Sequence, residues 1–261
     1  MDCTLDYEHA WQLLVEVRLA AQCTDARVNV VVQDLFAKYP NVAALAAAEP
    51  EEIEEIVRPC GLGRSKARDI SACMRMLRDK YDCNVPDDFD ALLELPGVGR
   101  KSANLIMGDV FGMPAIVTDT HCIRLCNRIG LVDNIKEPKK VEMALWKIIP
   151  PQEGSDFCHR LVDHGRAVCT ARTTPYCERC CLRDVCRYAH EERQSGLNQG
   201  THHITPRLLF ACFFIKHLVF GFGVCYNKST TFAACTGTHR KVGTRLWQPN
   251  TPTAPPAWAA Y

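Results

Sequence analysis

Apolar residues recur at spacings of three and four from about residue 9 to residue 189, and no alternating strand pattern is sustained there. Trp11, Leu14 and Leu19 form one such stripe. Asp25 is expected to cap the second helix and Ser65 to begin a later one. Further helices are expected at 87–94, 100–111, 119–128, 138–149 and 156–168. The pattern predicts an all-α protein with short connections.

One connection between expected helices carries a pair of glycines, in the run Leu95-Pro96-Gly97-Val98-Gly99-Arg100-Lys101. Glycine accepts positive φ, so Gly97 and Gly99 permit a sharp turn and leave no side chain between the backbone amides and a phosphate. This predicts a sequence-independent phosphate grip at about residues 93–104. The alternative is an ordinary glycine-containing helix connection.

Lys101 is placed to act as a nucleophile. It stands in the first turn of a helix, where the positive end of the helix dipole favours the neutral amine that can attack an electrophilic carbon. Asp119 opens another helix after the apolar residues 115–117. Taken singly, Lys101 could be a solvated phosphate contact and Asp119 a simple N-cap.

Four cysteines form a compact group with the spacing C-x7-C-x2-C-x5-C: Cys169, Cys177, Cys180 and Cys186. Four thiolates at such spacing can hold a [4Fe–4S] cluster or a tetrahedral zinc ion, and the spacing alone leaves both open. Cys181 is interpreted as a spare thiol that is not a ligand.

The formal net charge is +1, so any nucleic-acid contact must come from a local basic face and not from bulk charge. The chain has 16 cysteines, but its first residues, Met1-Asp2-Cys3-Thr4, lack the basic and apolar regions of a signal peptide. We therefore expect reduced thiols and metal ligands in a cytoplasmic protein, associated with the nucleoid if the source is bacterial.

These motifs follow one another in an order that resembles the endonuclease III family of helix-hairpin-helix DNA glycosylases. The resemblance rests on the run 95–104, on Thr118-Asp119-Thr120-His121, on the four cysteines, and upstream on the runs 19–25 and 61–67. It covers about residues 5–189 and implies a two-lobed, all-α fold with a [4Fe–4S] cluster loop. One departure is visible, because the family usually has six residues between its first two cysteine ligands, and this chain has seven.

The resemblance also implies roles for single residues. Lys101 matches the nucleophile that attacks C1′ of a damaged nucleotide and forms a Schiff base, and Asp119 matches the carboxylate that assists it. Gln22 and Leu62 match the side chains that enter the duplex when the base is flipped out. The hairpin residues Gly97, Gly99 and Arg100 are expected to bind DNA.

The implied activity is release of oxidised pyrimidines followed by strand cleavage 3′ to the abasic site by β-elimination. The expected partner is double-stranded DNA with damaged pyrimidines or abasic sites, bound by a monomer. A competing hypothesis is a non-catalytic, or monofunctional, DNA-binding protein of the same superfamily.

The expected domain organisation has four parts. Residues 1–21 form an N-terminal helix packed with the cluster lobe, 22–117 a helical barrel with the hairpin, and 118–189 a second lobe with the cluster loop. Residues 190–261 are unassigned and expected to be poorly ordered. Their apolar run at 208–226 is a poor membrane span because Lys216 and His217 interrupt it, so no membrane association is expected.

Overall fold

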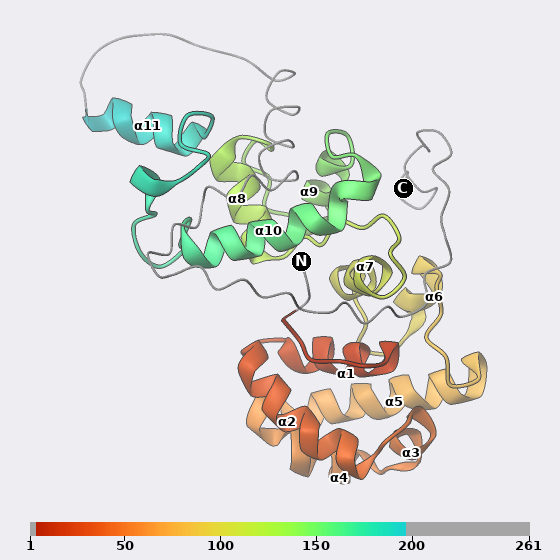
Figure 1. Cartoon of the computed structure of the whole chain (residues 1–261). Helices are drawn as coiled ribbons and strands as arrows, with labels where there is room; N and C mark the ends of the chain where they lie inside the picture. The colour runs from red at the N-terminus through yellow and green to blue at the C-terminus, as the bar shows by residue number, and fades with distance from the viewer. Residues whose placement is uncertain (1–3, 197–261) are drawn as a thin grey trace, which may run out of the picture.

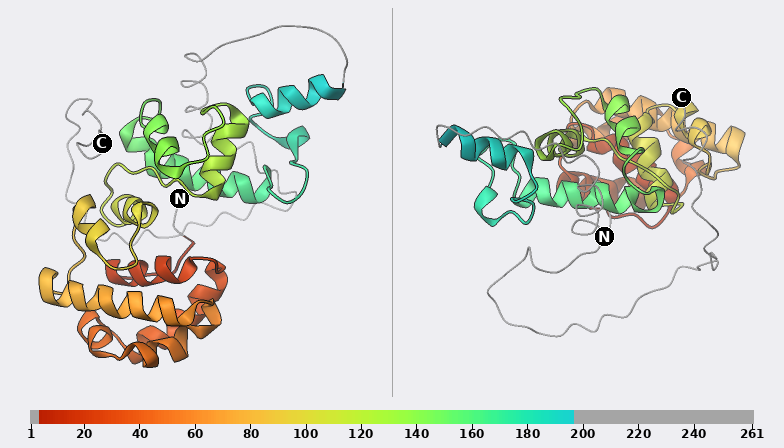
Figure 2. Two further views of the ribbon diagram at one scale, coloured as in Figure 1. Left: turned by 180° about the vertical axis from the view of Figure 1, so that it is seen from behind. Right: turned by 90° about the horizontal axis from the view of Figure 1, so that it is seen from above.

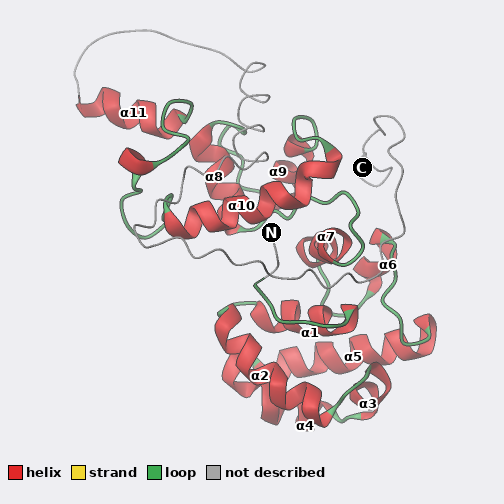
Figure 3. Ribbon diagram, in the orientation of Figure 1, coloured by secondary structure: helices red, strands yellow, loops and turns green. Residues whose placement is uncertain are grey.

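The computed structural model describes residues 4–196, with side chains through residue 191, and every regular element within this range is helical (Figures 1 and 3). This confirms the predicted all-α class. The α-helices are α1 (Ala10–Ala20), α2 (Asp25–Lys38), α3 (Val42–Ala47), α4 (Pro50–Val57), α5 (Gly63–Tyr81), α6 (Phe89–Glu94), α7 (Arg100–Asp109), α8 (Thr120–Ile129), α9 (Pro138–Leu145), α10 (Gly154–Ala167) and α11 (Arg187–Gly196). Three short 3₁₀ helices join them, η1 (Arg58–Cys60), η2 (Pro151–Glu153) and η3 (Cys177–Arg179).

The helices enclose two separate hydrophobic cores, and this gives the molecule two lobes. The first core is built from residues between Leu5 and Ala115, and the second from residues between Ile116 and Ala189. Figures 1 and 2 show α1 to α5 gathered in one lobe and α8 to α11 in the other, with α7 beside the junction. The two-lobed architecture therefore follows from where the apolar surface is buried.

Helix α1 belongs to the first lobe, so the prediction that residues 1–21 pack with the cluster lobe is wrong. The apolar face of α1 packs against α2, α5 and α7. Leu14 and Leu19 are buried in the first core, and the ring of Trp11 meets the ring of Phe36 edge-on at 5.1 Å. An amphipathic stripe shows that one face of a helix is buried, but it does not name the surface that covers it.

Three predicted boundaries also move. Thr24, not Asp25, is the N-cap of α2, and α5 begins at Gly63 with Leu62 as its N-cap, two residues before the predicted Ser65. Helix α11 continues past residue 189 to Gly196, so the segment predicted to be poorly ordered begins with a helix. The apolar run at 208–226 lies outside the described residues. Within the described part of the chain, no helix is long and apolar enough to cross a membrane.

Glu16 of α1 is fully buried between the first core and the start of the chain. Neither of its carboxylate oxygens has a hydrogen-bond partner within the described residues. Burial, together with the nearby charge of Asp6, raises the pKa of Glu16 from 4.5 to about 8. The first lobe therefore holds a carboxyl group that is protonated at neutral pH.

The Glu16→Gln substitution should flatten the pH dependence of stability. Between pH 4.5 and about 8 the folded protein holds a proton on Glu16 that the unfolded chain has lost. The free energy of unfolding therefore falls as the pH rises through this window, by up to about 1.4 kcal/mol per pH unit. Urea unfolding at pH 5.5 and pH 8 should show this loss in the wild type and a smaller loss in Glu16→Gln. The matched substitution of exposed Glu8→Gln should behave as the wild type, and an equal loss in all three proteins would contradict the assignment.

Candidate active site

A cavity of about 340 Å³ lies at the junction of the two lobes, where α7 meets α1 and α10. Its wall includes Lys101 from α7, Asp119 at the start of α8, and His159 and Arg166 from α10. Gln22, in the turn after α1, lines it as well. The volume is in the range of sites that hold a small organic group. The structure thus brings the predicted nucleophile and its predicted helper into one cavity.

Lys101 and Asp119 enter this cavity from the starts of two helices. Lys101 is the second residue of α7 and is exposed. Asp119 is the N-cap of α8, and its Oδ1 accepts a hydrogen bond of 2.7 Å from the backbone N–H of Cys122. Capping fixes the orientation of this carboxylate, so Asp119 is both a helix N-cap and a residue of the cavity that holds Lys101.

Asp25 is a cavity residue that the sequence interpretation missed. Its Oδ2 accepts hydrogen bonds from Thr4 Oγ1 at 2.7 Å and from Arg166 Nη2 at 2.9 Å. Burial alone would raise the pKa of Asp25, but these two bonds and the charges of Arg166 and Lys101 hold it below the usual value. Asp25 is predicted to be a local helix cap, whereas its partners Thr4 and Arg166 are 21 and 141 positions away. The contact joins α2 of one lobe to α10 of the other.

Gln22 and Leu62 stand on two neighbouring turns with unusual backbone angles. Gln22 has φ of +58° and Leu62 has φ of +53°, the left-handed region that non-glycine residues rarely adopt. Leu62 is 58% exposed, which excludes the alternative that it packs in a core. Gln22 is exposed too, and no hydrogen bond of its side chain is found within residues 4–196. Both side chains are therefore free to meet a ligand.

The two hairpin glycines have different tasks. Gly97 has φ of +79°, and a Cβ placed there would lie 2.9 Å from Asp69 Cβ and 3.1 Å from Arg18 Cδ. Arg18 and Asp69 form an ion pair of 2.6 Å directly beneath the turn. Gly99 has φ of −98° and ψ of 175° and caps α7, with nothing within 4 Å of the place of a Cβ. The prediction that both glycines allow a positive φ is correct for Gly97 alone. At Gly99 the missing side chain leaves open space at the start of α7.

The side chain of Arg100 is engaged inside the protein, and its predicted role in DNA binding stays a prediction. Its Nε and Nη2 donate to Glu142 at 2.6 and 2.8 Å, and its guanidinium lies 5.0 Å above the ring of Phe89. Glu142 is fully buried in α9. A bidentate pair with a buried carboxylate is costly to break, so Arg100 ties α7 to the second lobe.

The four predicted ligand cysteines lie in the loop between α10 and α11 and at its ends. Burial, together with the nearby sulfurs of Cys186, Cys169 and Cys177, raises the pKa of the Cys180 thiol to about 11. Among the described residues, no group of His, Cys, Asp or Glu side chains approaches closely enough to hold a single metal ion. Cys181 is exposed.

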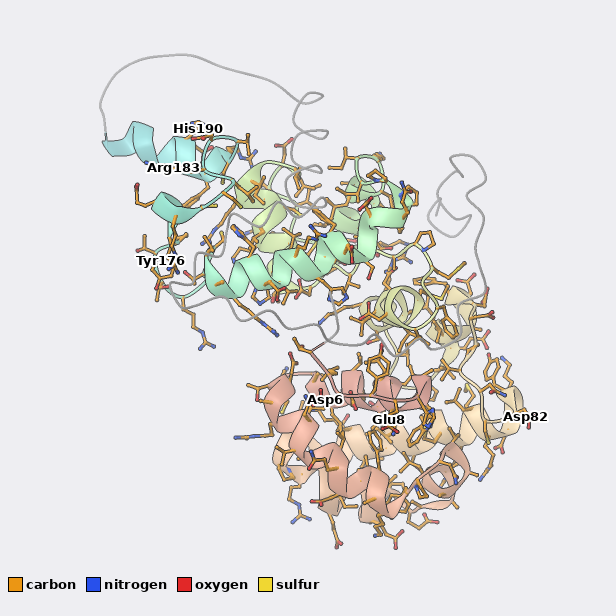
Figure 4. The ribbon with its side chains drawn as sticks, in the orientation of Figure 1. Asp6, Glu8, Asp82, Tyr176, Arg183 and His190 are labelled. Atoms are coloured by element: carbon orange, nitrogen blue, oxygen red, sulfur yellow. The ribbon has the colours of Figure 1, made fainter. Side chains whose placement is uncertain are left out.

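The additional residue in the x7 spacing is accommodated on the outside of this loop. Residues 171–174 are all exposed, and Thr170 Oγ1 closes the bend by donating to Thr173 O at 3.1 Å. Figure 4 labels Tyr176, Arg183 and His190 around the same end of the second lobe, far from Asp82 at the end of α5.

Known proteins share this sequence and this architecture. The family described as HhH-GPD superfamily base excision DNA repair protein matches residues 15–151. Endonuclease III of Synechocystis sp. is 44% identical over 185 residues, which are 70% of this chain and 84% of the relative. Endonuclease III of Bacillus subtilis is 38% identical over 196 residues, 75% of this chain and 89% of the relative. A solved endonuclease III trapped as a covalent intermediate with DNA superimposes with a TM-score of 0.69 at 43% identity, covering 73% of this chain and 89% of that one.

The hairpin, the two lobes and the cavity between them define a base-excision DNA repair protein of the helix-hairpin-helix class. Within that class the chain belongs to the endonuclease III family, whose enzyme type is DNA glycosylase/AP lyase.

The two hairpin glycines should respond differently to a methyl group. Gly97→Ala adds left-handed strain and a collision with Asp69 and Arg18, so the free energy of unfolding should fall by roughly 1–3 kcal/mol. Gly99→Ala should lower stability by less than about 1 kcal/mol, because nothing lies within 4 Å of the added methyl group, and should weaken binding to duplex DNA by crowding a phosphate held at the start of α7. Urea unfolding and fluorescence anisotropy separate the two effects. Equal destabilisation by both substitutions would contradict this division of tasks.

Proposed function

We propose that this protein is a bifunctional DNA N-glycosylase and AP lyase that removes oxidised pyrimidines and then cuts the strand. The observation that carries the proposal is the shared cavity of Lys101 and Asp119 at the junction of the lobes. The nucleophile must be an amine for the lyase reaction. An amine forms an imine with the sugar, which opens a route to strand cleavage that a hydroxyl nucleophile or an activated water does not open. The similar endonuclease III that was trapped as a covalent intermediate with DNA supports the same chemistry.

The reaction follows from these two side chains. Lys101 Nζ forms a bond to C1′, the bond from C1′ to the base nitrogen breaks, and its electron pair leaves with the base. Asp119 assists by taking the proton from the amine or by stabilising the positive charge on the sugar. Opening of the sugar ring gives a Schiff base, which acidifies the C2′ proton. Loss of that proton expels the 3′ phosphate and leaves a strand break on the 3′ side.

The damaged nucleotide must leave the base stack before Lys101 can reach C1′, and this costs a few kcal/mol. We infer that Gln22 fills the vacated space and that Leu62 enters the opposite strand. Their exposure on two neighbouring turns supports this assignment. The hairpin amides around Gly99 would hold a backbone phosphate, which fixes register without reading sequence. The partner is duplex DNA with a damaged pyrimidine or an abasic site, bound by a monomer.

Sodium borohydride should trap the protein covalently on a duplex with an abasic site, because reduction turns the Schiff base into a stable amine. Lys101→Ala should abolish the adduct, seen as a loss of the shifted band on a denaturing gel. Lys140→Ala is the matched control, since Lys140 is an exposed lysine paired with Glu137 at 2.8 Å, and it should be trapped as the wild type is. An undiminished adduct with Lys101→Ala, or none with the wild type, would exclude the lyase assignment.

We also propose that Cys169, Cys177, Cys180 and Cys186 hold a [4Fe–4S] cluster. All four cysteines pack at the second core, and the endonuclease III family to which the chain belongs supports an iron–sulfur cluster over a zinc ion. Two N–H groups point at the sulfurs, from Arg128 Nη1 to Cys169 at 3.3 Å and from the Leu182 amide to Cys180 at 3.4 Å. When bound, the cluster would serve as a structural crosslink that fixes the loop on α8 and α10.

Two serine substitutions in the same loop test which cysteines bind the cluster. Cys177→Ser should lose most of the bound iron and the visible iron–sulfur absorbance, while Cys181→Ser should retain both because Cys181 is exposed and spare. Iron, sulfide and zinc are measured in the purified proteins. Zinc in place of iron in the wild type, or loss of iron in Cys181→Ser, would overturn the assignment.

A further inference from the structure

A histidine in the wall of the cavity pairs with a carboxylate, and the proposed chemistry uses neither. His159 of α10 lines the same cavity as Lys101 and Asp119. Its ring Nε2 lies 2.8 Å from Oδ1 of Asp109, the last residue of α7. The side chain of His159 is 18% exposed and that of Asp109 is 7% exposed. The pair is thus nearly buried, with the ring on the side of the cavity.

Asp109 holds the ring in one orientation. Ser155 Oγ donates a second hydrogen bond of 3.1 Å to the same oxygen, which fixes the carboxylate. Oδ2 of Asp109 is buried and has no hydrogen-bond partner within the described residues. The bond to Asp109 raises the pKa of His159, and the ring is then more often the imidazolium at neutral pH. Both ring nitrogens of an imidazolium are donors, so Nδ1 is the one left for a ligand.

The position of the pair along α7 agrees with a role at the base end of a flipped nucleotide. Lys101 is at the start of α7 and Asp109 at its end, a separation of about 12 Å along the axis at 1.5 Å per residue. If the sugar lies at Lys101, the base extends away from it, into the part of the cavity that His159 lines. Pyrimidines carry carbonyl oxygens on the ring, and these accept hydrogen bonds.

We propose that His159, oriented by Asp109, donates a hydrogen bond to a carbonyl oxygen of the flipped oxidised pyrimidine and stabilises the negative charge that the base gains as its bond to C1′ breaks. This inference rests on the proposed glycosylase and lyase function. It makes His159 a residue of base recognition and of the first chemical step. It has no part in the lyase step, because the base has left by then.

The test compares two substrates with the same sequence, one duplex with a single thymine glycol and one with a preformed abasic site. With His159→Gln the single-turnover rate of base release should fall by roughly 100-fold, the effect of losing one preorganised donor. Borohydride trapping and strand cleavage on the abasic duplex should persist. Asp109→Asn, which keeps the side-chain volume but weakens the orienting bond, should reduce base release in the same direction. His190→Gln changes an exposed histidine at the far end of the second lobe and should leave base release unchanged (Figure 4).

Thermal unfolding and the visible absorbance of each variant show whether it has folded. Equal losses on both substrates in a folded His159→Gln protein, or no loss on the thymine glycol duplex, would overturn the inference. If His159→Gln does not fold, Asp109→Asn decides by the same two criteria. Failure of the proposed function is distinct from this, because the wild type would then form no adduct on the abasic duplex.

Discussion

The packing of helix α7 between the two hydrophobic cores is the constraint on which the site depends. Ala103, Ile106 and Met107 are buried in the first core, and Leu105 packs against both cores. At Gly108 a Cβ would lie only 2.8 Å from Ser155 Oγ, so α7 and α10 approach closely at this point. Because both faces of the helix are held, its two ends are held as well. Lys101 at one end therefore enters the cavity, and Asp109 at the other end holds His159 in the cavity wall.

Polar contacts at the same junction fix the positions of the charged side chains around the cavity. Arg100 reaches Glu142 of the second lobe, Asp25 accepts from Arg166, and His159 pairs with Asp109. Each contact joins residues of different lobes. Apolar burial brings the lobes together without direction, whereas hydrogen-bonded ion pairs require one relative placement. The contacts that fix the lobes thus also orient the acidic and basic groups near Lys101.

The sequence predicted local structure well and long-range partners poorly, for a physical reason. Apolar periodicity fixes which residues of a helix are buried, and Gly97 marks a turn that only glycine fits, so both could be recognised without a structure. The covering surface of α1 and the partners of Arg100 and Asp25 depend on how distant segments meet. Arg100 is 42 residues from Glu142, and no local pattern encodes that distance. The partner of His159, Asp109, is likewise 50 residues away in the chain.

The turns that carry Gln22 and Leu62 show how strain and function coincide. Both residues hold left-handed backbone angles that cost about 1–3 kcal/mol each, and a glycine would adopt them without strain. At Gly97 the packing against Asp69 excludes any side chain, but Leu62 is exposed, so packing does not explain the leucine there. The reason for a glutamine and a leucine at these strained positions must therefore lie in their side chains. Gln22 lines the cavity and Leu62 is exposed, which fits the insertion into a duplex proposed above, because a side chain that displaces a base benefits from preorganisation.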